Sequence, residues 1–182
     1  MTAVLTITEG CTSVIEWPVI VRQHGPIVWK TAYRLLGQDA DAADCFQETF
    51  VSAIEYAGRR EVTNWPGLLQ RLATARALDH LRRRIRTGRR RVPGISCEQL
   101  AASGPGPDQV ALDAEMGDRL RAALCELAPQ QSAVFSLRCL SGLSYEEIAS
   151  ELGLSIDTVG VTLHRARARL QEFLGGSTGR KN

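Results

Sequence analysis

The feature that most constrains the fold is a nearly continuous helical spacing of apolar residues, interrupted once in the middle of the chain. Apolar positions recur every three or four residues along most of the 182 residues, and no alternating strand pattern of convincing length occurs. Residues 87–107 lack this spacing, and three of the seven prolines fall there together with several glycines. The sequence therefore predicts an all-α protein with two small helical domains joined by a flexible linker.

The predicted boundaries follow from this interruption and from helix start and stop signals. A tail of residues 1–18 precedes a domain of residues 19–86, and the linker of residues 87–107 leads to a domain of residues 108–174 and a tail of residues 175–182. In the first domain we expect helices from Pro18 to Leu36, from Asp39 to Gly58, and from an N-cap at Asn64 onward. The second domain should contain four helical segments.

The expected inward stripes come from the same spacing. The second helix should bury one face, and the third and last helices should do the same. The residues concerned are Phe46, Phe50, Ala53, Ile54 and Ala57; Leu68, Leu72, Ala75, Leu78 and Ile85; and Val159, Leu163, Ala166, Leu170 and Phe173.

The net charge of +2 conceals strong segregation along the chain. Residues 1–56 carry a net charge of −4, residues 57–91 of +9, residues 92–154 of −6 and residues 155–182 of +3. Arginine outnumbers lysine 20 to 2, which favours phosphate and base contacts over simple solvation. This alternation is typical of a protein that meets nucleic acid at two places and a protein partner elsewhere.

Several classes of protein are disfavoured by what the sequence lacks. No apolar run is long enough for a membrane span and no secretory signal is visible at the start, so we expect a cytoplasmic protein without membrane insertion. The five cysteines are scattered and form no CxxC pair, which predicts reduced thiols and no metal site. No phosphate-binding glycine loop or nucleophile motif occurs, so we expect neither a cofactor nor enzymatic activity.

The C-terminal region has the pattern of a helix-turn-helix. Ser144 and Glu147 form a capping box, Gly153 marks a turn, and Ser155 can cap a last amphipathic helix. Such a helix can lie in the major groove with its outward residues toward the bases. The candidates for DNA contact are Ser155, Asp157, Thr158, Val161, Thr162, His164, Arg165 and Arg167. Spacing alone leaves open an ordinary helix pair whose arginines are solvated.

At this point the chain resembles a known family. The segments APQQSAVFSLR (128–138), GLSYEEIA (142–149) and LHRARARL (163–170) are similar to region 4 of sigma-70 factors, closest to the extracytoplasmic-function group. The resemblance implies that this domain reads the promoter −35 element and touches the flap of the polymerase β subunit. Where the family usually has two basic residues and a serine, this chain has Gly160, Val161 and Thr162. Phosphate affinity should therefore fall, and Val161 or Thr162 could contact thymine methyls.

The N-terminal domain resembles region 2 of the same family through YRLLG (33–37) and DAADCFQETF (41–50). The resemblance implies that an acidic helix docks on the clamp helices of the polymerase β′ subunit. The residues that it places in this contact are Asp41, Asp44, Gln47 and Glu48. A merely solvated acidic face is the alternative.

The segments LLQRLA (68–73) and ALDHLRRR (77–84) resemble the family's −10 recognition helix. Seven arginines among residues 82–91 should form an electrostatic path for a DNA backbone. The candidates for −10 contact are Arg60, Arg76, His80, Arg82, Arg83, Arg84 and Arg86. Trp65 could stack on an unpaired base, although packing in the core is favoured for it. Leu68 and Ala75 replace a Trp and an Asn of the family, so −10 recognition is either relaxed or depends on the preceding loop and the arginines. Thr74 and Arg76 could substitute for the lost amide.

The predicted function is a sigma factor that binds core RNA polymerase and promoter DNA, with an anti-sigma factor as a further partner. Two alternatives remain open. A stand-alone helix-turn-helix regulator would need a dimer contact and a palindromic site, and no dimerisation helix is evident. An interaction protein that binds an anti-sigma factor without starting transcription would account for the departures at Ala75 and at residues 160–162.

Overall fold

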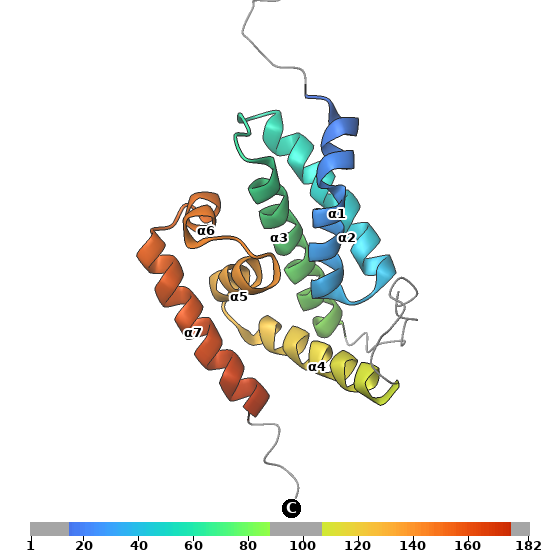
Figure 1. Ribbon diagram of the computed structural model, residues 1–182, viewed down its shortest axis with the longest axis vertical. Helices are drawn as coiled ribbons and strands as arrows, with labels where there is room; N and C mark the ends of the chain where they lie inside the picture. Colours follow the sequence, from blue (N-terminus) through green and yellow to red (C-terminus); the bar gives the residue numbers. More distant parts are fainter. Residues whose placement is uncertain (1–14, 88–106, 176–182) are drawn as a thin grey trace, which may run out of the picture.

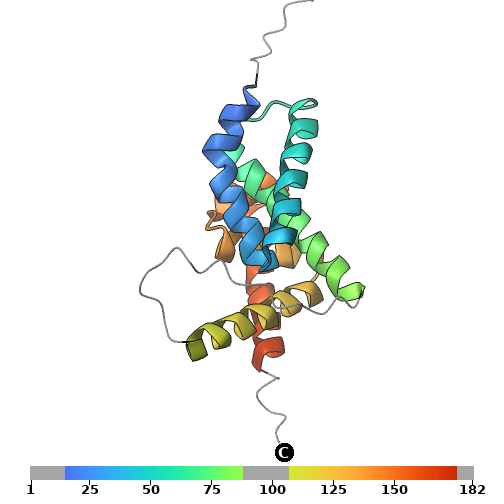
Figure 2. The ribbon, with the colours of Figure 1, turned by 90° about the vertical axis from the view of Figure 1, so that its right-hand side faces the viewer.

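The computed structural model describes residues 15–87 and 107–175, and it arranges them in two helical modules. The first module consists of α1 (Trp17–Leu36), α2 (Asp39–Ala57) and α3 (Trp65–Arg86), which lie side by side (Figures 1 and 2). The second module consists of α4 (Pro107–Glu126), α5 (Pro129–Phe135), a π-helical turn η1 (Ser136–Leu140), α6 (Tyr145–Leu152) and α7 (Ile156–Gly175). Every regular element in these residues is helical, which confirms the all-α prediction.

Local signals in the sequence set the helix ends. The Asn64 side chain accepts a hydrogen bond from the Gly67 amide at 3.1 Å, as an N-cap does. Ser144 and Glu147 form the predicted capping box at the start of α6. α1 ends at Gly37 with φ 69°, a left-handed conformation that favours glycine. The predicted helix starts at these caps are therefore confirmed.

Each module has a hydrophobic cluster of its own. Val28, Phe50 and Leu69 belong to the cluster of the first module, where α1, α2 and α3 meet. Leu137, Ile148 and Leu163 belong to the cluster of the second module, which joins η1, α6 and α7. The cluster of the second module holds α6 against α7.

A third cluster joins the two modules, which the sequence pattern did not predict. It contains Leu36, Leu78 and Leu81 of the first module, together with Leu124 of α4 and Leu127 just after it, all of them buried. Burial of one leucine side chain contributes about 1.5–3 kcal/mol. Several such residues on each side therefore hold the modules in one arrangement, with α5 and α6 between α3 and α7 (Figure 1).

The predicted inward stripes need four corrections. Ile54 and Ile85 are each 49% exposed, Phe173 is 40% exposed, and Ala75 is also exposed. α2 packs with the side that carries Phe50 and Ala53, and Ile54 lies one position beyond it. Phe173 lies near the end of α7, where the Arg169 guanidinium covers its ring instead of the core.

The linker prediction cannot be followed, because residues 88–106 lie outside the described residues, as do most of both predicted tails. In the part of the chain that the structure describes, no helix has the length and apolar character of a membrane span. Among those same residues, no three His, Cys, Asp or Glu side chains gather in a way that could hold a metal ion.

Candidate nucleic-acid and polymerase interfaces

The helix-turn-helix of α6 and α7 is built by short-range hydrogen bonds and one small core. After α6 the chain turns at Gly153, whose φ of 65° is left-handed. The Ser155 hydroxyl then accepts a hydrogen bond from the Thr158 amide at 3.1 Å and caps the start of α7. Val159 and Leu163 of α7 pack against Ile148 of α6. This packing leaves the opposite side of α7 free of the core.

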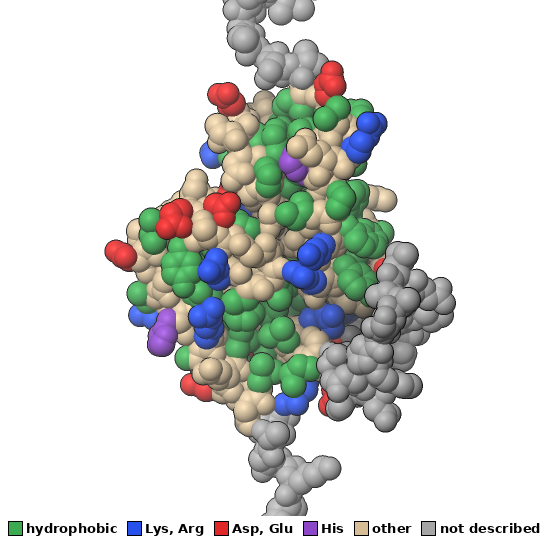
Figure 3. All heavy atoms as spheres, in the orientation of Figure 1, with side chains coloured by type: hydrophobic (Ala, Val, Ile, Leu, Met, Phe, Trp, Pro, Cys, Tyr) green, Lys and Arg blue, Asp and Glu red, His purple; other side chains and the backbone are tan. Residues whose placement is uncertain are grey.

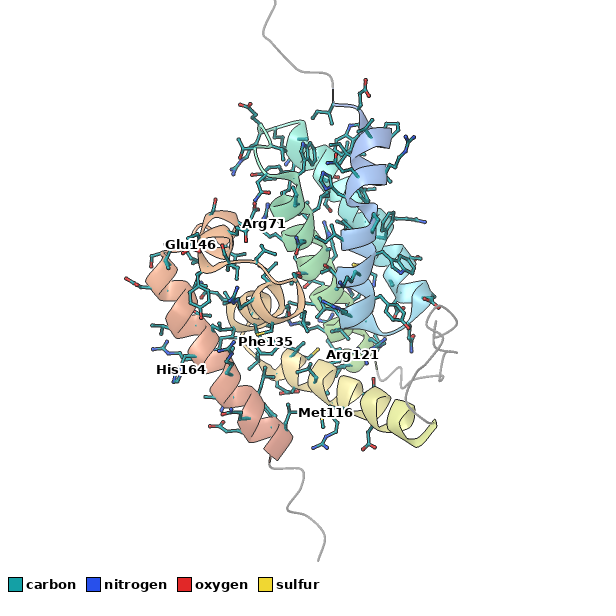
Figure 4. All side chains as sticks on the ribbon, in the orientation of Figure 1. Arg71, Met116, Arg121, Phe135, Glu146 and His164 are labelled. Carbon is teal, nitrogen blue, oxygen red and sulfur yellow. The ribbon has the colours of Figure 1, made fainter. Side chains whose placement is uncertain are left out.

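That opposite side is the outer row of α7, which we define as Asp157, Thr158, Val161, His164 and Arg165. All five are exposed, and Val161 exposes 51% of its surface. α7 lies along the margin of the molecule, and His164 projects from its outer side (Figure 4). Acidic side chains gather at the α6 end of this face, and basic side chains follow farther along α7 (Figure 3). The outer row is therefore accessible to a DNA duplex.

Thr162 requires a correction. The sequence placed it outward with the candidate −35 contacts, whereas it is 9% exposed and lies with the core side of α7. It stands at the margin of the buried stripe between Val159 and Ala166, so the packing of α7 on its own module covers it. Arg167 is exposed at the other margin of α7, and its Nη2 lies 3.8 Å from the Cys139 sulfur.

One support of the turn was missed by sequence reasoning. The Arg138 guanidinium lies 5.3 Å from the centre of the Tyr145 ring and donates a hydrogen bond to the Leu143 carbonyl at 2.8 Å. Tyr145 is also the nearest neighbour that a side chain at Gly160 would meet, at 3.8 Å. Tyr145 thus connects η1, α6 and α7 at the base of the reading helix. The π-helical turn that orients Arg138 has no clear sequence signal.

In the first module, α2 and α3 line a hollow that we call the α2–α3 hollow. Asp44, Gln47, Glu48 and Glu55 of α2 line it with the exposed Val51. The structure therefore brings together three of the four residues predicted to bind polymerase. α3 contributes Arg76 and Arg83 to the same hollow, so its charge is mixed.

Two hydrogen bonds across the α2–α3 hollow fix its polar side chains. His80 Nε2 lies 3.0 Å from Glu48 Oε2, and this hydrogen bond holds the pKa of the Glu48 carboxyl below its ordinary value. The Arg76 guanidinium donates to the Ser52 hydroxyl at 2.8 Å. Both α3 side chains were predicted to contact −10 DNA, whereas in the structure they hold side chains of α2.

Asp41 and Arg84 lie apart from this hollow. Arg84 Nη1 is 2.9 Å from Asp41 Oδ2 and also donates to the Leu36 carbonyl at 3.2 Å. This pair connects the end of α1 with the start of α2 and the last turns of α3. Asp41 is therefore already paired with Arg84 in this arrangement and does not line the α2–α3 hollow.

The remaining candidate −10 residues are Arg60, Arg82, Arg83 and Arg86. Arg60 is exposed in the loop before α3, with its guanidinium 5.8 Å from the Tyr56 ring centre. Arg82 donates to the Ser132 hydroxyl of α5 at 2.7 Å. Arg82 also lines a second hollow together with the exposed Arg83 and Arg86 and with Cys125 and Glu126 of α4. Three of the seven residues predicted for −10 contact therefore lie together at this second hollow, whereas Arg60 lies in the loop before α3.

Trp65 is packed rather than available for stacking. Its ring meets that of Trp17 edge to face, with centroids 5.5 Å apart. This agrees with the packing alternative that the sequence favoured for it.

Comparison with known proteins decides the family. Residues 20–87 match the family model described as Sigma-70 region 2, and residues 117–170 match the one described as Sigma-70, region 4. Over 173 residues the chain is 36% identical to the ECF RNA polymerase sigma factor SigE of Mycolicibacterium smegmatis, covering 95% of this chain and 67% of that protein. The chain belongs to the sigma-70 family, in the extracytoplasmic-function group.

For a second relative, the match covers most of both proteins. The RNA polymerase sigma-E factor of Streptomyces coelicolor is 35% identical over 167 residues, which are 88% of this chain and 87% of that protein. This sigma factor thus directs RNA polymerase to promoters, as the sequence predicted. Sigma factors are initiation factors without enzymatic activity of their own.

Two solved structures share the fold of this sigma factor. The sigma factor RpoE in complex with the anti-sigma factor NepR from Bartonella quintana has a TM-score of 0.52 and 24% identity, covering 88% of this chain and 97% of its own. CnrH in complex with the cytosolic domain of CnrY has a TM-score of 0.56 and 21% identity, covering 87% of each chain. At these identities the likeness concerns the fold alone.

Proposed function

We propose that this sigma factor divides promoter recognition between its two modules and acts by binding alone. The outer row of α7 reads the −35 element as duplex, and α3 with its arginines holds the −10 strand after melting. The α2–α3 hollow docks on the β′ clamp helices, and the second module contacts the β flap. The chain acts in the cytoplasm and is controlled by an anti-sigma factor of the kind bound in the related complexes.

The observation that carries this proposal is the exposed outer row on a braced α7. A helix whose inner side is fixed by Val159 and Leu163 presents its other side at a defined angle, as major-groove reading requires. Val161 supplies an apolar surface that suits a thymine methyl, and Arg165 supplies the fork of donors that suits guanine or phosphate. Thr162 no longer belongs to this reading set because it is buried.

The α2–α3 hollow supports the docking part of the proposal. Asp44, Gln47 and Glu48 lie along one side of α2, and the exposed Val51 and Ile54 add apolar surface next to the carboxylates. An apolar centre with a polar margin is the usual composition of a protein interface. Since His80 holds Glu48 by a hydrogen bond, the carboxylate is already oriented before a partner arrives.

Run-off transcription with core polymerase tests the proposal. Promoters are first mapped from transcription starts after overexpression, and one of them then serves as template. The wild-type chain should give a transcript that depends on both promoter elements. A double variant with Val161→Ala and Arg165→Ala should lose −35-dependent transcription while still binding core polymerase. Absence of any transcript with the wild type would favour the alternative of an anti-sigma-binding protein without initiation activity.

A further inference from the structure

The second hollow lies where the last turns of α3 meet the end of α4 (Figures 1 and 2). Its volume of about 520 Å³ is within the range of about 300–1,000 Å³ that small-molecule sites in proteins occupy. Each module supplies part of its wall, since α3 belongs to the first module and α4 to the second. Neither −35 reading by α7 nor docking through α2 accounts for a hollow at this place.

Three arginines of α3 line the second hollow, and two of them are available to a ligand. Arg82 already donates to the Ser132 hydroxyl at 2.7 Å and lies 3.7 Å from Asp79 Oδ1. Arg83 and Arg86 are exposed, and no hydrogen bond or ion pair joins either guanidinium to another of the described residues. Positions three apart are neighbours on a helix surface, so both guanidiniums can reach adjacent phosphates of one ligand. Their forked donors fit phosphate oxygens.

The rest of the wall suits a nucleoside better than a bare anion. Two carboxylates, Asp79 and Glu126, stand against the three arginines, so charge alone attracts an anion only weakly. The exposed Ile85 and the half-buried Cys125 supply apolar surface against which a base or a ribose can pack. The exposed Glu126 carboxylate can accept hydrogen bonds from a ribose hydroxyl or from the amino group of a base.

Cys125 is a reporter within the second hollow. Burial raises the pKa of its thiol above the ordinary value, while Arg82 and Arg84 act against this shift and Glu126 adds to it. The charges of α3 therefore reach the wall that α4 supplies. At neutral pH the thiol is protonated, so it adds no charge of its own to the hollow.

We infer that the second hollow binds a nucleoside polyphosphate. The phosphates of this ligand bind Arg83 and Arg86. Its nucleoside packs against Ile85 and Cys125 and donates a hydrogen bond to Glu126. One consequence rests on the proposed function, because a bound nucleotide occupies arginines that α3 would use to hold the −10 strand. The outer row of α7 lies on another helix, so duplex binding stays unaffected.

Calorimetric titration of the full chain with ATP, GTP and inorganic pyrophosphate tests the binding. At least one of the two nucleotides should bind saturably, and more tightly than pyrophosphate. The double variant Arg83→Ala with Arg86→Ala should weaken nucleotide binding about tenfold or more. Arg22→Ala, which removes an exposed arginine of α1, is the matched control and should change nothing. Absence of saturable nucleotide binding overturns the inference, and so does an equal loss for Arg22→Ala.

Glu126→Gln tests the nucleoside part of the inference. Removal of this negative charge should strengthen pyrophosphate binding, whereas the nucleotide also loses an acceptor. The preference for nucleotide over pyrophosphate should therefore fall about fivefold. If the variant gained equal affinity for both ligands, charge alone would account for binding and the nucleoside assignment would be overturned.

Alkylation with N-ethylmaleimide, followed by mass spectrometry, locates the ligand. A saturating concentration of the tighter-binding nucleotide should slow modification of Cys125 several-fold. The exposed Cys139 of η1 is the internal reference and should react at an unchanged rate. If Cys125 reacted equally fast with and without saturating nucleotide, the ligand would bind elsewhere and the site would be wrong.

Competition with DNA separates this inference from the proposed function. Nucleotide at ten times its dissociation constant should weaken binding of a fluorescent −10 oligonucleotide about tenfold, with −35 duplex affinity unchanged. Strand binding that does not respond to bound nucleotide overturns the competition. A chain that binds the strand but no nucleotide refutes the site alone. A chain that binds nucleotide but no strand supports the site and refutes the −10 role of α3.

Discussion

α3 and α7 both carry arginines suited to DNA, yet the two helices differ in how much of their surface other helices cover. α7 packs on its own module with one side and exposes the outer row, including Val161 at 51%. α3 packs on α1 and α2 with one side and is covered on another by α4, α5 and α6. The difference shows that helical pattern and charge indicate a DNA-binding helix, whereas tertiary contacts decide whether its surface is available.

The largest expected effect distinguishes the two sides of α7. Leu163→Ala removes a fully buried side chain from the cluster of the second module and should lower the free energy of unfolding by about 3 kcal/mol. Val161→Ala on the outer row should change it by less than about 0.5 kcal/mol. Urea unfolding followed by circular dichroism measures both. Equal losses for the two variants would contradict the assignment of inner and outer sides.

Arg165→Ala tests whether the outer row of α7 contacts the −35 duplex. We expect duplex affinity for the −35 element to fall by about 1–3 kcal/mol, and the salt dependence of binding to decrease by about one counterion. Arg169→Ala is the matched control, because Arg169 lies farther along the same helix and contacts Glu172 and Phe173. Fluorescence anisotropy at several salt concentrations measures both variants. An equally large loss of duplex affinity for Arg169→Ala would show a general effect of charge rather than a specific contact of Arg165 with the −35 element.

His80→Ala tests whether His80 supports polymerase binding through α2 or contacts the −10 strand. Because His80 holds the Glu48 carboxylate, its loss should weaken binding of core polymerase several-fold and leave single-stranded DNA affinity unchanged. His80→Gln retains an amide donor and should recover part of the affinity. Titration of labelled core enzyme provides the measurement. If the variant bound core polymerase normally but lost affinity for single-stranded DNA, His80 would instead be a −10 contact.

The smallest expected effect concerns pH. The pKa of Glu48 is lowered from an ordinary value of 4.5, chiefly by the His80 hydrogen bond and further by Arg83 and Arg76, with burial opposing them. A lowered folded pKa stabilises the fold above about pH 4.5, and this contribution is lost as the pH falls through the lowered value. Glu48→Gln should therefore cost less than about 1 kcal/mol near pH 6, and this cost should shrink as the pH falls through the lowered pKa, as urea unfolding can measure. A cost independent of pH would refute this origin.

Most of the secondary structure could be predicted because its signals are local. Asn64, Ser144 and Gly153 act within four residues of themselves, so the sequence contains all that their caps require. Whether a residue at the edge of an apolar stripe is buried or exposed was less predictable. Thr162, Ile54 and Phe173 lie at the edges of apolar stripes, and contacts between helices decide whether each is buried.

The candidate site was predicted in part for the same reason. Asp44, Gln47 and Glu48 line one hollow because residues three and four apart share a face of α2. The sequence predicted one basic surface for the arginines after residue 75, yet Arg76 and Arg84 contact α2 and Arg82 contacts α5. Glu151 carries no local signal at all, since its partners Arg71 and Asn64 lie 80 and 87 residues away. The DNA and polymerase roles of these residues remain predictions.

The most direct test of the central claim is the distance between the modules in the free chain. Fluorophores on Ala75 of α3 and Ser150 of α6, both exposed, report this distance by energy transfer in single molecules. The account predicts one short distance for the free chain and a longer one after binding to core polymerase and promoter DNA. A long or broad distance in the free chain, unchanged when polymerase and promoter are added, would contradict it.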